Sequence, residues 1–168
     1  MKKRFHLIAL GSAGAVCCAS ILIHPFGPIK AQQSRERLLT GAQVESSVLA
    51  IFGRSCQECH SEKTAWPWYS YVAPMSWMIE KDVQQGRSHM NLSRWYEYSD
   101  EQKQQILSEM ASLVRNRQMP LPRYLLLHRE AKLSDAEVDQ LYQWTRRERK
   151  RLKSMETPAE VTSSVGGS

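Results

Sequence analysis

The stretch Cys56-Gln57-Glu58-Cys59-His60 decides how this 168-residue chain is interpreted. Two cysteines three positions apart lie on one helical turn, where both thiols can add to the two vinyl groups of one haem. The histidine that follows then reaches the iron and supplies a neutral imidazole ligand. The motif therefore predicts one covalently bound haem c per chain, attached through Cys56 and Cys59 and ligated by His60.

Three other readings of this cysteine pair are open on the sequence alone. A structural zinc site needs four ligands, and His89 and His128 are isolated and lack the usual spacing. A thioredoxin-type pair needs a preceding strand, whereas the flanking sequence here is helical in pattern. A plain disulfide would leave His60 without a role. The haem motif explains all three residues and is preferred.

The N-terminus has the layout of an export signal. Lys2-Lys3-Arg4 precedes an uncharged stretch over 7–23. This stretch is long for the core of a signal peptide and short for a spanning helix, which needs about 20 residues. We expect residues 1–31 to form an uncleaved signal anchor, with cleavage after Ala31 as the alternative. Because covalent haem attachment occurs on the exported side, residues 32–168 are expected at the periplasmic side of the cytoplasmic membrane.

The net charge of +6 first suggests a nucleic-acid partner. The excess of bases lies at the two ends of the chain, and the stretch 32–143 is nearly neutral. We therefore expect no nucleic-acid partner. The expected contacts are a redox partner protein in the periplasm or membrane, and the membrane itself through the N-terminal helix. The run 146–151 is either a docking patch for an acidic partner or a solvated helix end.

The body of the chain shows helical periodicity and no alternating strand pattern. It predicts an all-α, cytochrome c-like domain over 32–153 with long loops, followed by a disordered tail over 154–168. Capping boxes, Ser99 with Gln102 and Ser134 with Glu137, open two of the helices. Helices are expected at 34–52 with Gly53 as its stop, 75–85 with Gly86 as its stop, 99–117 and 134–153. An aromatic loop is expected at 66–71 and an irregular segment at 87–98.

The sequence offers several candidates for the second axial ligand of the iron. Met119 is the strongest candidate, because it lies in a loop directly before Pro120 and a thioether is a soft ligand. The alternative interpretation is that Met119 is an ordinary buried methionine without a ligand role. Other candidates are Met75, Met78, Met90, His89 and His128, and an open sixth position is a further alternative.

The choice of this ligand separates the candidate functions. Ligation by His60 and Met119 would raise the reduction potential and close the iron, which suits electron transfer. An open position would suit a peroxide-handling haem enzyme or a haem-based redox or gas sensor. We expect an electron carrier rather than an enzyme and assign no catalytic residue.

The chain also resembles a bacterial haem-binding domain family that is related in pattern to monohaem cytochromes c. The matching pieces, in order, are Cys-Gln-Glu-Cys-His-Ser (56–61), Thr-Ala-Trp-Pro-Trp-Tyr-Ser (64–70), Ala-Pro-Met-Ser-Trp (73–77), Asp-Val-Gln-Gln-Gly-Arg (82–87), Asn-Leu-Ser-Arg-Trp (91–95), Met-Pro-Leu-Pro-Arg-Tyr (119–124) and Leu-Ser-Asp-Ala-Glu (133–137). The resemblance implies a covalent haem on an exported domain, with an N-terminal membrane segment, and says little about the reaction. Met75 and Leu92 depart conservatively from the family pattern.

Further residues are candidates for the surroundings of the haem. Arg87 is a candidate partner for a haem propionate, with a solvated surface arginine as the default. The carbonyl of Pro67 or Pro74 could accept a hydrogen bond from the second nitrogen of His60. Large aromatic side chains are expected to form the pocket wall rather than an electron path. They are Trp66, Trp68, Tyr69, Trp77 and Trp95.

Overall fold

The computed structural model describes residues 11–12, 14–15, 18–19 and 29–156. Within them the chain forms helices joined by loops, and no strand is present. This agrees with the predicted all-α class. The elements are η1 (Ile29–Ala31), α2 (Ser46–Ser55), α3 (Gln57–His60), η2 (Trp68–Tyr71), α4 (Met75–His89), η3 (Leu92–Glu97), α5 (Asp100–Arg115), α6 (Pro122–Leu125), η4 (Arg129–Ala131) and α7 (Asp135–Glu156), where η marks a 3-10 helix.

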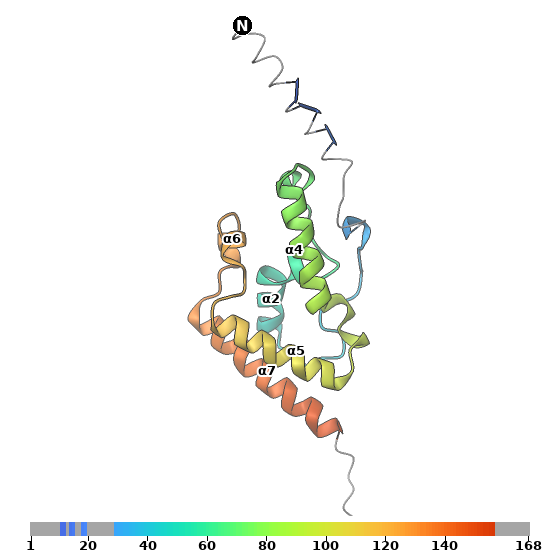
Figure 1. The fold of residues 1–168 in the computed structure, drawn as a ribbon. Coiled ribbons are helices and arrows are strands. Elements are labelled where there is room, and N and C mark those ends of the chain that lie inside the picture. Colours follow the sequence, from blue (N-terminus) through green and yellow to red (C-terminus); the bar gives the residue numbers. More distant parts are fainter. Residues whose placement is uncertain (1–10, 13, 16–17, 20–28, 157–168) are drawn as a thin grey trace, which may run out of the picture.

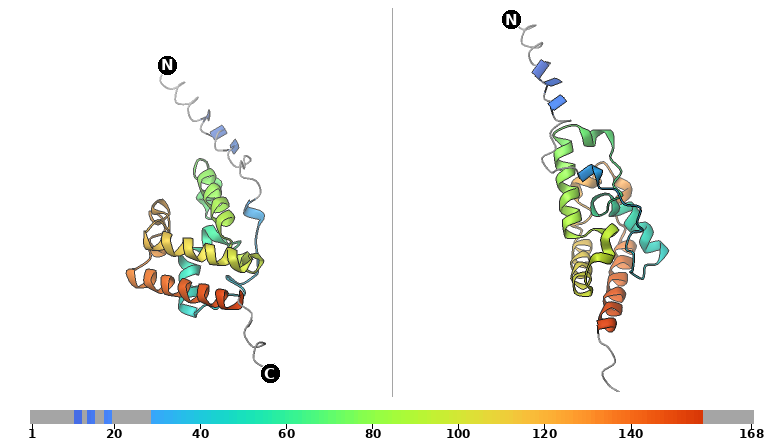
Figure 2. Two further views of the ribbon diagram at one scale, coloured as in Figure 1. Left: turned by 60° about the horizontal axis from the view of Figure 1, so that its bottom comes forward. Right: turned by 90° about the vertical axis from the view of Figure 1, so that its right-hand side faces the viewer.

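Helices α5 and α7 lie side by side along the base of the molecule (Figures 1 and 2). Both predicted capping boxes are present and begin these helices. Ser99 Oγ accepts a hydrogen bond from the Gln102 N–H at 3.2 Å, and Gln102 Oε1 accepts one from the Ser99 N–H at 2.9 Å. Glu137 Oε2 likewise accepts from the Ser134 N–H at 2.9 Å. These bonds satisfy N–H groups that a helix start otherwise leaves unpaired.

The hydrophobic core lies between α2, α5 and α7. Phe52 meets Trp144 edge-on, with ring centroids 5.2 Å apart, and both side chains are fully buried. Burying side chains of this size contributes about 1.5–3 kcal/mol each. The core also includes Leu39, Val48, Ile51, Met90, Leu92, Trp95, Leu107, Met110, Val114, Leu133, Val138, Leu141 and Leu152.

The predicted helix over 34–52 is wrong at both ends. Residues before Ser46 form turns, with Leu39 at a φ of 58° and Gly41 at 96°, backbone angles that no right-handed helix contains. Leu39 is nevertheless buried, so its apolar character reflects packing of a turn rather than a helical stripe. Gly53 does not stop the helix, which continues to Ser55.

The predicted stop of the next helix at Gly86 is also wrong, because α4 continues to His89. A Cβ atom at Gly86 would lie 2.6 Å from the carbonyl oxygen of Cys59. Glycine is therefore needed here for close approach of α4 to the motif, a role that sequence periodicity does not reveal. The segments predicted as an aromatic loop and as irregular contain η2 and η3.

The folded body starts earlier and ends later than predicted. Ile29 is buried and Lys30 is half-buried, so part of the segment assigned to the anchor packs on the domain. Helix α7 continues to Glu156, three residues into the predicted tail. The rest of that tail, and most of the predicted anchor, lie outside the described residues. Within the described residues, no helix combines the length and the apolar character needed to cross a membrane.

Candidate haem-binding site

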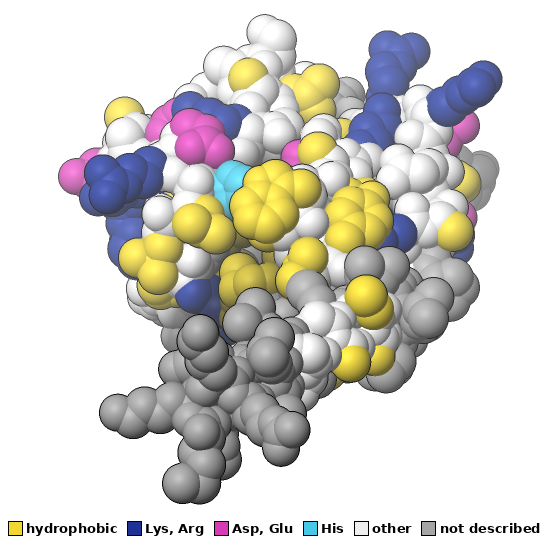
Figure 3. Space-filling model, turned by 90° about the horizontal axis from the view of Figure 1, so that it is seen from above, with side chains coloured by type: hydrophobic (Ala, Val, Ile, Leu, Met, Phe, Trp, Pro, Cys, Tyr) yellow, Lys and Arg dark blue, Asp and Glu magenta, His cyan; other side chains and the backbone are white. Residues whose placement is uncertain are grey.

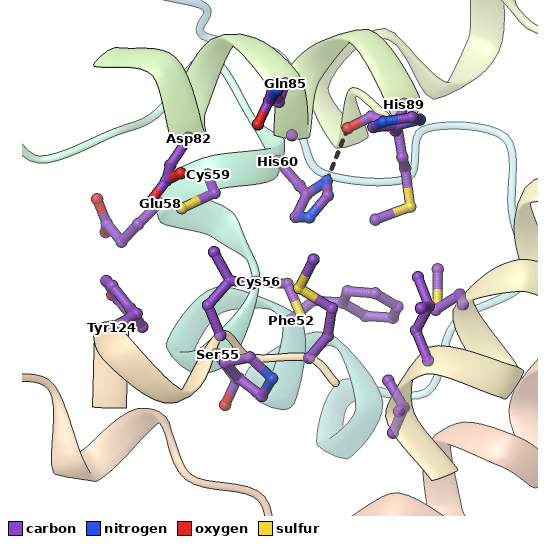
Figure 4. Close-up of a pocket in the computed structure, with 18 of the residues that line it drawn as sticks. Phe52, Ser55, Cys56, Glu58, Cys59, His60, Asp82, Gln85, His89 and Tyr124 are labelled. Atoms are coloured by element: carbon purple, nitrogen blue, oxygen red, sulfur yellow. Dashed lines mark hydrogen bonds between the residues drawn. The ribbon is translucent and has the colours of Figure 1, made fainter. Parts of the chain in front are cut away.

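A cavity of about 430 Å³ lies between the pair α3–α4 and the pair α5–α6 (Figure 4). Its volume is in the range of small-molecule and cofactor sites, roughly 300–1,000 Å³. Most of its wall is apolar. The lining residues are Phe52, Ser55, Cys56, Glu58, Cys59, His60, Asp82, Gln85, Gly86, His89, Met90, Ile106, Glu109, Met110, Leu113, Val114, Met119, Pro120, Leu121, Arg123, Tyr124, Leu133 and Leu141.

The cysteine–histidine motif forms one helical turn at the edge of this cavity. Cys56 ends α2, and its carbonyl accepts a hydrogen bond from the His60 N–H at 3.0 Å. The two thiols and the imidazole therefore come from a single short segment, and all three residues line the cavity. Gly86 allows α4 to press against this turn and to hold it in place.

The imidazole of His60 is oriented by the backbone. Its Nδ1 lies 3.1 Å from the carbonyl oxygen of Met90, a bond drawn in Figure 4. The sequence predicts the carbonyl of Pro67 or Pro74 as the acceptor of this hydrogen bond. In the structure the carbonyl belongs to Met90, the residue directly after α4. A proton on Nδ1 leaves Nε2 as the nitrogen available to a metal. Burial lowers the pKa of His60, which keeps the imidazole in the neutral form that ligates.

The two thiols are free and protonated. Burial raises the pKa of Cys56 to about 12 and that of Cys59 to about 11. They form no disulfide in the structure. Within the described residues, no cluster of three or more His, Cys, Asp or Glu side chains could hold a metal ion, so the zinc alternative gains no support.

The structure reduces the set of candidates for the second axial ligand. Met119 lines the cavity from the loop after α5, as does Met110 from within α5. Met110 also belongs to the hydrophobic core, and the sequence did not single it out as a candidate ligand. His89 and Met90 also line the cavity. They belong to the chain segment that binds His60 Nδ1, so they lie on the same side of the cavity as His60. Three further candidates, Met75, Met78 and His128, do not line the cavity.

Arg87 does not line the cavity either. Its Nε donates to the Ser61 carbonyl at 2.8 Å, and one terminal nitrogen donates to the Ile29 carbonyl at 3.1 Å. The other terminal nitrogen donates to Thr64 Oγ1 at 3.1 Å. The side chain is buried and ties three chain segments together. Arg87 therefore has a structural role. The predicted contact between Arg87 and a haem propionate gains no support from this placement.

The predicted aromatic wall is likewise absent from the cavity. Trp77 and the other four aromatic residues named for that wall are not among the lining residues. Trp95 is fully buried in the core, whereas Trp68 is largely exposed. Aliphatic and methionine side chains from α5 and the loop that follows it form one part of the cavity wall instead.

Charged and phenolic side chains lie along the cavity edge near Cys59. Arg123 in α6 forms a two-pronged pair with Asp82 in α4, with Nε–Oδ2 and Nη2–Oδ1 distances of 3.1 and 2.5 Å. Tyr124 and Glu58 line the cavity beside this pair. Burial raises the pKa of the Tyr124 hydroxyl and of the Glu58 carboxyl. Arg123 and Tyr124 belong to the segment 119–124, which resembles the family. Their place at the cavity edge follows from the contact between α4 and α6 and could not be predicted from the sequence.

The donor set of this cavity fits a haem. Two protonated thiols and an available imidazole nitrogen belong to one wall, thioethers belong to another, and the space between is apolar. Comparison with known families agrees, because the haem-binding domain family matches residues 16–147. The chain belongs to the haem-binding domain family. The matched range includes every residue that lines the cavity.

Membership supports haem as the cofactor of this domain and extends the resemblance found over 56–144 toward the N-terminus. Neither the curated proteins nor the solved structures gave a match. Within this haem-binding domain, the basic run 146–151 is engaged in internal contacts. Arg147 pairs with Glu45 at 2.6 Å, and Arg151 pairs with the buried carboxylate of Glu148 at 2.5 Å. The Arg147 pair joins α7 to the residue before α2, and the Arg151 pair lies within α7.

Proposed function

We propose that this protein is an exported monohaem c-type cytochrome that transfers electrons. The observation that carries the proposal is the shared cavity of Cys56, Cys59 and His60, with the imidazole held by the Met90 carbonyl. A pair of free thiols beside an oriented imidazole is the arrangement that covalent haem attachment needs.

The residues of the cavity have distinct roles in this proposal. Cys56 and Cys59 would hold the haem through two thioether bonds, His60 would ligate through Nε2, and Met119 would supply the second axial sulfur. When bound, haem supplies one-electron redox chemistry at its iron. The apolar wall from α5 excludes water and, together with a methionine ligand, favours a raised reduction potential.

Electron transfer is favoured over a reaction on a bound substrate because Met110 and Met119 line the cavity and lie outside the segment that binds His60 Nδ1. A thioether on the iron closes the position at which peroxide or a small gas would bind. The competing functions, a peroxide-handling enzyme or a haem-based sensor, need that position to be open or easily vacated. The identity of the sixth ligand therefore separates the proposals.

Export and anchoring are supported by the sequence of the N-terminus. Lys2-Lys3-Arg4 followed by the apolar stretch 7–23 is typical of an export signal. Covalent attachment through two cysteines takes place on the exported side of the membrane, so the two features agree. We accordingly propose a periplasmic location for the haem-binding domain, fastened to the cytoplasmic membrane by residues 1–31.

Covalent attachment is tested by expression in a bacterial host that matures c-type cytochromes. We expect the full chain to keep its haem on a denaturing gel stained for haem. The variants Cys56→Ala and Cys59→Ala each lose one attachment point and should retain far less, and the double variant none. Cys18→Ala is the matched control, because Cys18 lies outside the motif and is exposed. If the wild-type chain loses its haem on the denaturing gel to the same extent as the double variant, covalent attachment is contradicted.

The sixth ligand is tested by optical spectra of the oxidised protein. A sulfur–iron charge-transfer band near the red edge is expected in the wild type and in Met110→Ala, and its loss is expected in Met119→Ala. If Met110→Ala alone loses the band, the ligand is Met110 and the carrier function stands. A high-spin wild-type spectrum that shifts with cyanide or peroxide would overturn the carrier in favour of an enzyme or sensor.

A further inference from the structure

Large hydrophobic side chains are exposed at the end of the domain where α4 begins. Trp68 and Tyr71 belong to η2, and Trp77 and Met78 belong to the first turn of α4. Their exposed fractions are 79, 44, 36 and 39% in that order. Figure 3 looks down on this end and shows hydrophobic side chains gathered there, with Lys and Arg side chains at the margin. We call these four residues the aromatic face.

The aromatic face continues toward α6. The hydroxyl of Tyr69 lies 3.0 Å from Nε2 of His128, which ties η2 to the segment after α6. Leu126 and Leu127 in that segment are 75 and 61% exposed. Isolated exposed hydrophobic residues are common, but several large ones gathered at one end of a domain (Figure 3) mark an interaction surface.

The N-terminal chain joins the domain beside this face. Lys30 Nζ lies 4.0 Å from the ring centroid of Tyr71 and donates to the Ser70 carbonyl at 2.5 Å. The same nitrogen pairs with the buried carboxylate of Glu80 in α4 at 3.1 Å. Together with the burial of Ile29, these contacts fix where the chain leaves the domain. The exit point is therefore set by the fold and lies next to Tyr71.

The short connection limits how far the face can be from a membrane that holds the N-terminal apolar stretch. Ile29 follows Ile23 by six positions, and six residues span at most about 20 Å when extended. Tryptophan and tyrosine are also the side chains enriched where proteins meet the lipid headgroups. The position of the face and its chemistry thus point to the same partner.

We propose that the aromatic face rests in the lipid headgroup region of the membrane that holds residues 7–23. This inference rests on the anchoring part of the proposed function and adds an orientation to it. The cavity-lining part of α4 begins at Asp82, seven residues after Met75, which is about 10 Å along the helix axis. Docking on this face would therefore hold the haem cavity close to the membrane surface, within reach of a membrane-embedded redox partner.

Photocrosslinking in the full, haem-loaded chain tests the orientation. The chain is placed in vesicles of phosphatidylethanolamine and phosphatidylglycerol, and p-benzoylphenylalanine replaces one residue at a time. Tyr96 in η3, which follows the far end of α4, is the matched control at 53% exposure. We expect about tenfold more lipid adduct from Trp68→p-benzoylphenylalanine than from Tyr96→p-benzoylphenylalanine, because interfacial aromatic positions contact lipid.

A second pair of probe positions gives an independent measurement in case one of the first two variants fails to fold. Met78→p-benzoylphenylalanine is compared with Met155→p-benzoylphenylalanine, since Met155 is exposed at the end of α7. The same excess of lipid adduct is expected at position 78. Flotation of the vesicles reports anchoring separately from orientation.

Each other outcome overturns the inference. Equal adducts at positions 68 and 96 in a chain that floats would leave anchoring intact and reject the docking. A chain that does not float would reject anchoring, and the docking with it. Adducts from position 68 to a second copy of the chain would identify the face as a self-association surface instead.

Discussion

The haem cavity and the contact cluster around Lys30 use polar side chains in opposite ways. In the cavity, the thiols of Cys56 and Cys59 are free, and one nitrogen of His60 is held so that the other is available. In the cluster, Lys30 forms an ion pair with the buried carboxylate of Glu80, and the Lys30 side chain itself is 16% exposed. One region keeps its reactive atoms available for a ligand, and the other uses its charges within the protein.

This difference explains why the prediction for Arg87 lacks support. An arginine near a haem motif suggests a partner for a propionate, but a guanidinium has a limited number of donors. The Arg87 donors are used by Ser61, Thr64 and Ile29. A buried charged group needs such partners, because burial without them costs several kcal/mol. Four of the five N–H groups of Arg87 are used within the protein, and this separates a structural charge from one that is available to a ligand.

The largest effect is expected from breaking the cluster. Lys30→Met removes the cation that faces the buried carboxylate of Glu80 and should destabilise the protein by about 3 kcal/mol. Denaturant unfolding of the haem-loaded chain measures the change, and the optical spectrum should stay unchanged. Lys81→Met removes an exposed lysine from the same helix, α4, and should cost less than about 0.5 kcal/mol. Similar losses in the two variants would mean that the ion pair contributes nothing.

A smaller effect is expected where α4 meets the cavity. Gly86→Ala places a Cβ atom 2.6 Å from the Cys59 carbonyl oxygen, so α4 must move away from the motif. We expect a loss of about 1–3 kcal/mol and a lower yield of attached haem. Gly53→Ala is the control, since no atom lies within 4 Å of its Cβ position, and it should stabilise α2 by roughly 0.5–1 kcal/mol. Unchanged haem yield in Gly86→Ala would show that the close approach is dispensable.

The smallest effect belongs to the cap of α7, which lies outside both regions. Hydrogen bonds from the Ser134 N–H and from Arg54 hold the pKa of Glu137 below its ordinary value of 4.5. Because the carboxyl binds protons more weakly in the folded state, its contribution is present above pH 4.5 and is lost as the pH falls below it.

The isosteric variant Glu137→Gln removes this dependence. Between about pH 5 and pH 3, the wild type should lose roughly 0.5–1 kcal/mol more stability than Glu137→Gln, the size of a helix cap. Unfolding curves at both pH values measure the difference. Asp139→Asn, an exposed carboxylate on the same helix, should follow the wild type. Parallel pH profiles for the wild type and Glu137→Gln would refute the assignment.

Capping signals predicted the starts of α5 and α7 correctly, whereas the first predicted helix begins at Ser46 instead of position 34. The capping boxes at Ser99 and Ser134 are confirmed because a cap is a contact between residues three positions apart. Helix ends were predicted poorly, since both glycines taken as stops lie inside helices. At Gly86 the reason for glycine is a contact with Cys59, which lies 27 positions earlier and is invisible to a local pattern.

The sequence by itself determined the haem motif, the helical class and the family, because these depend on residue types at short, fixed spacings. Only the tertiary structure decided which carbonyl orients His60, which methionines line the cavity and why Arg87 is not among the lining residues. It also placed Lys30 on the domain, beside the aromatic face. These outcomes depend on contacts between segments that are distant in the sequence. Such contacts determine which side chains are buried and which hydrogen-bond partners they find, and no local run of residues contains that information.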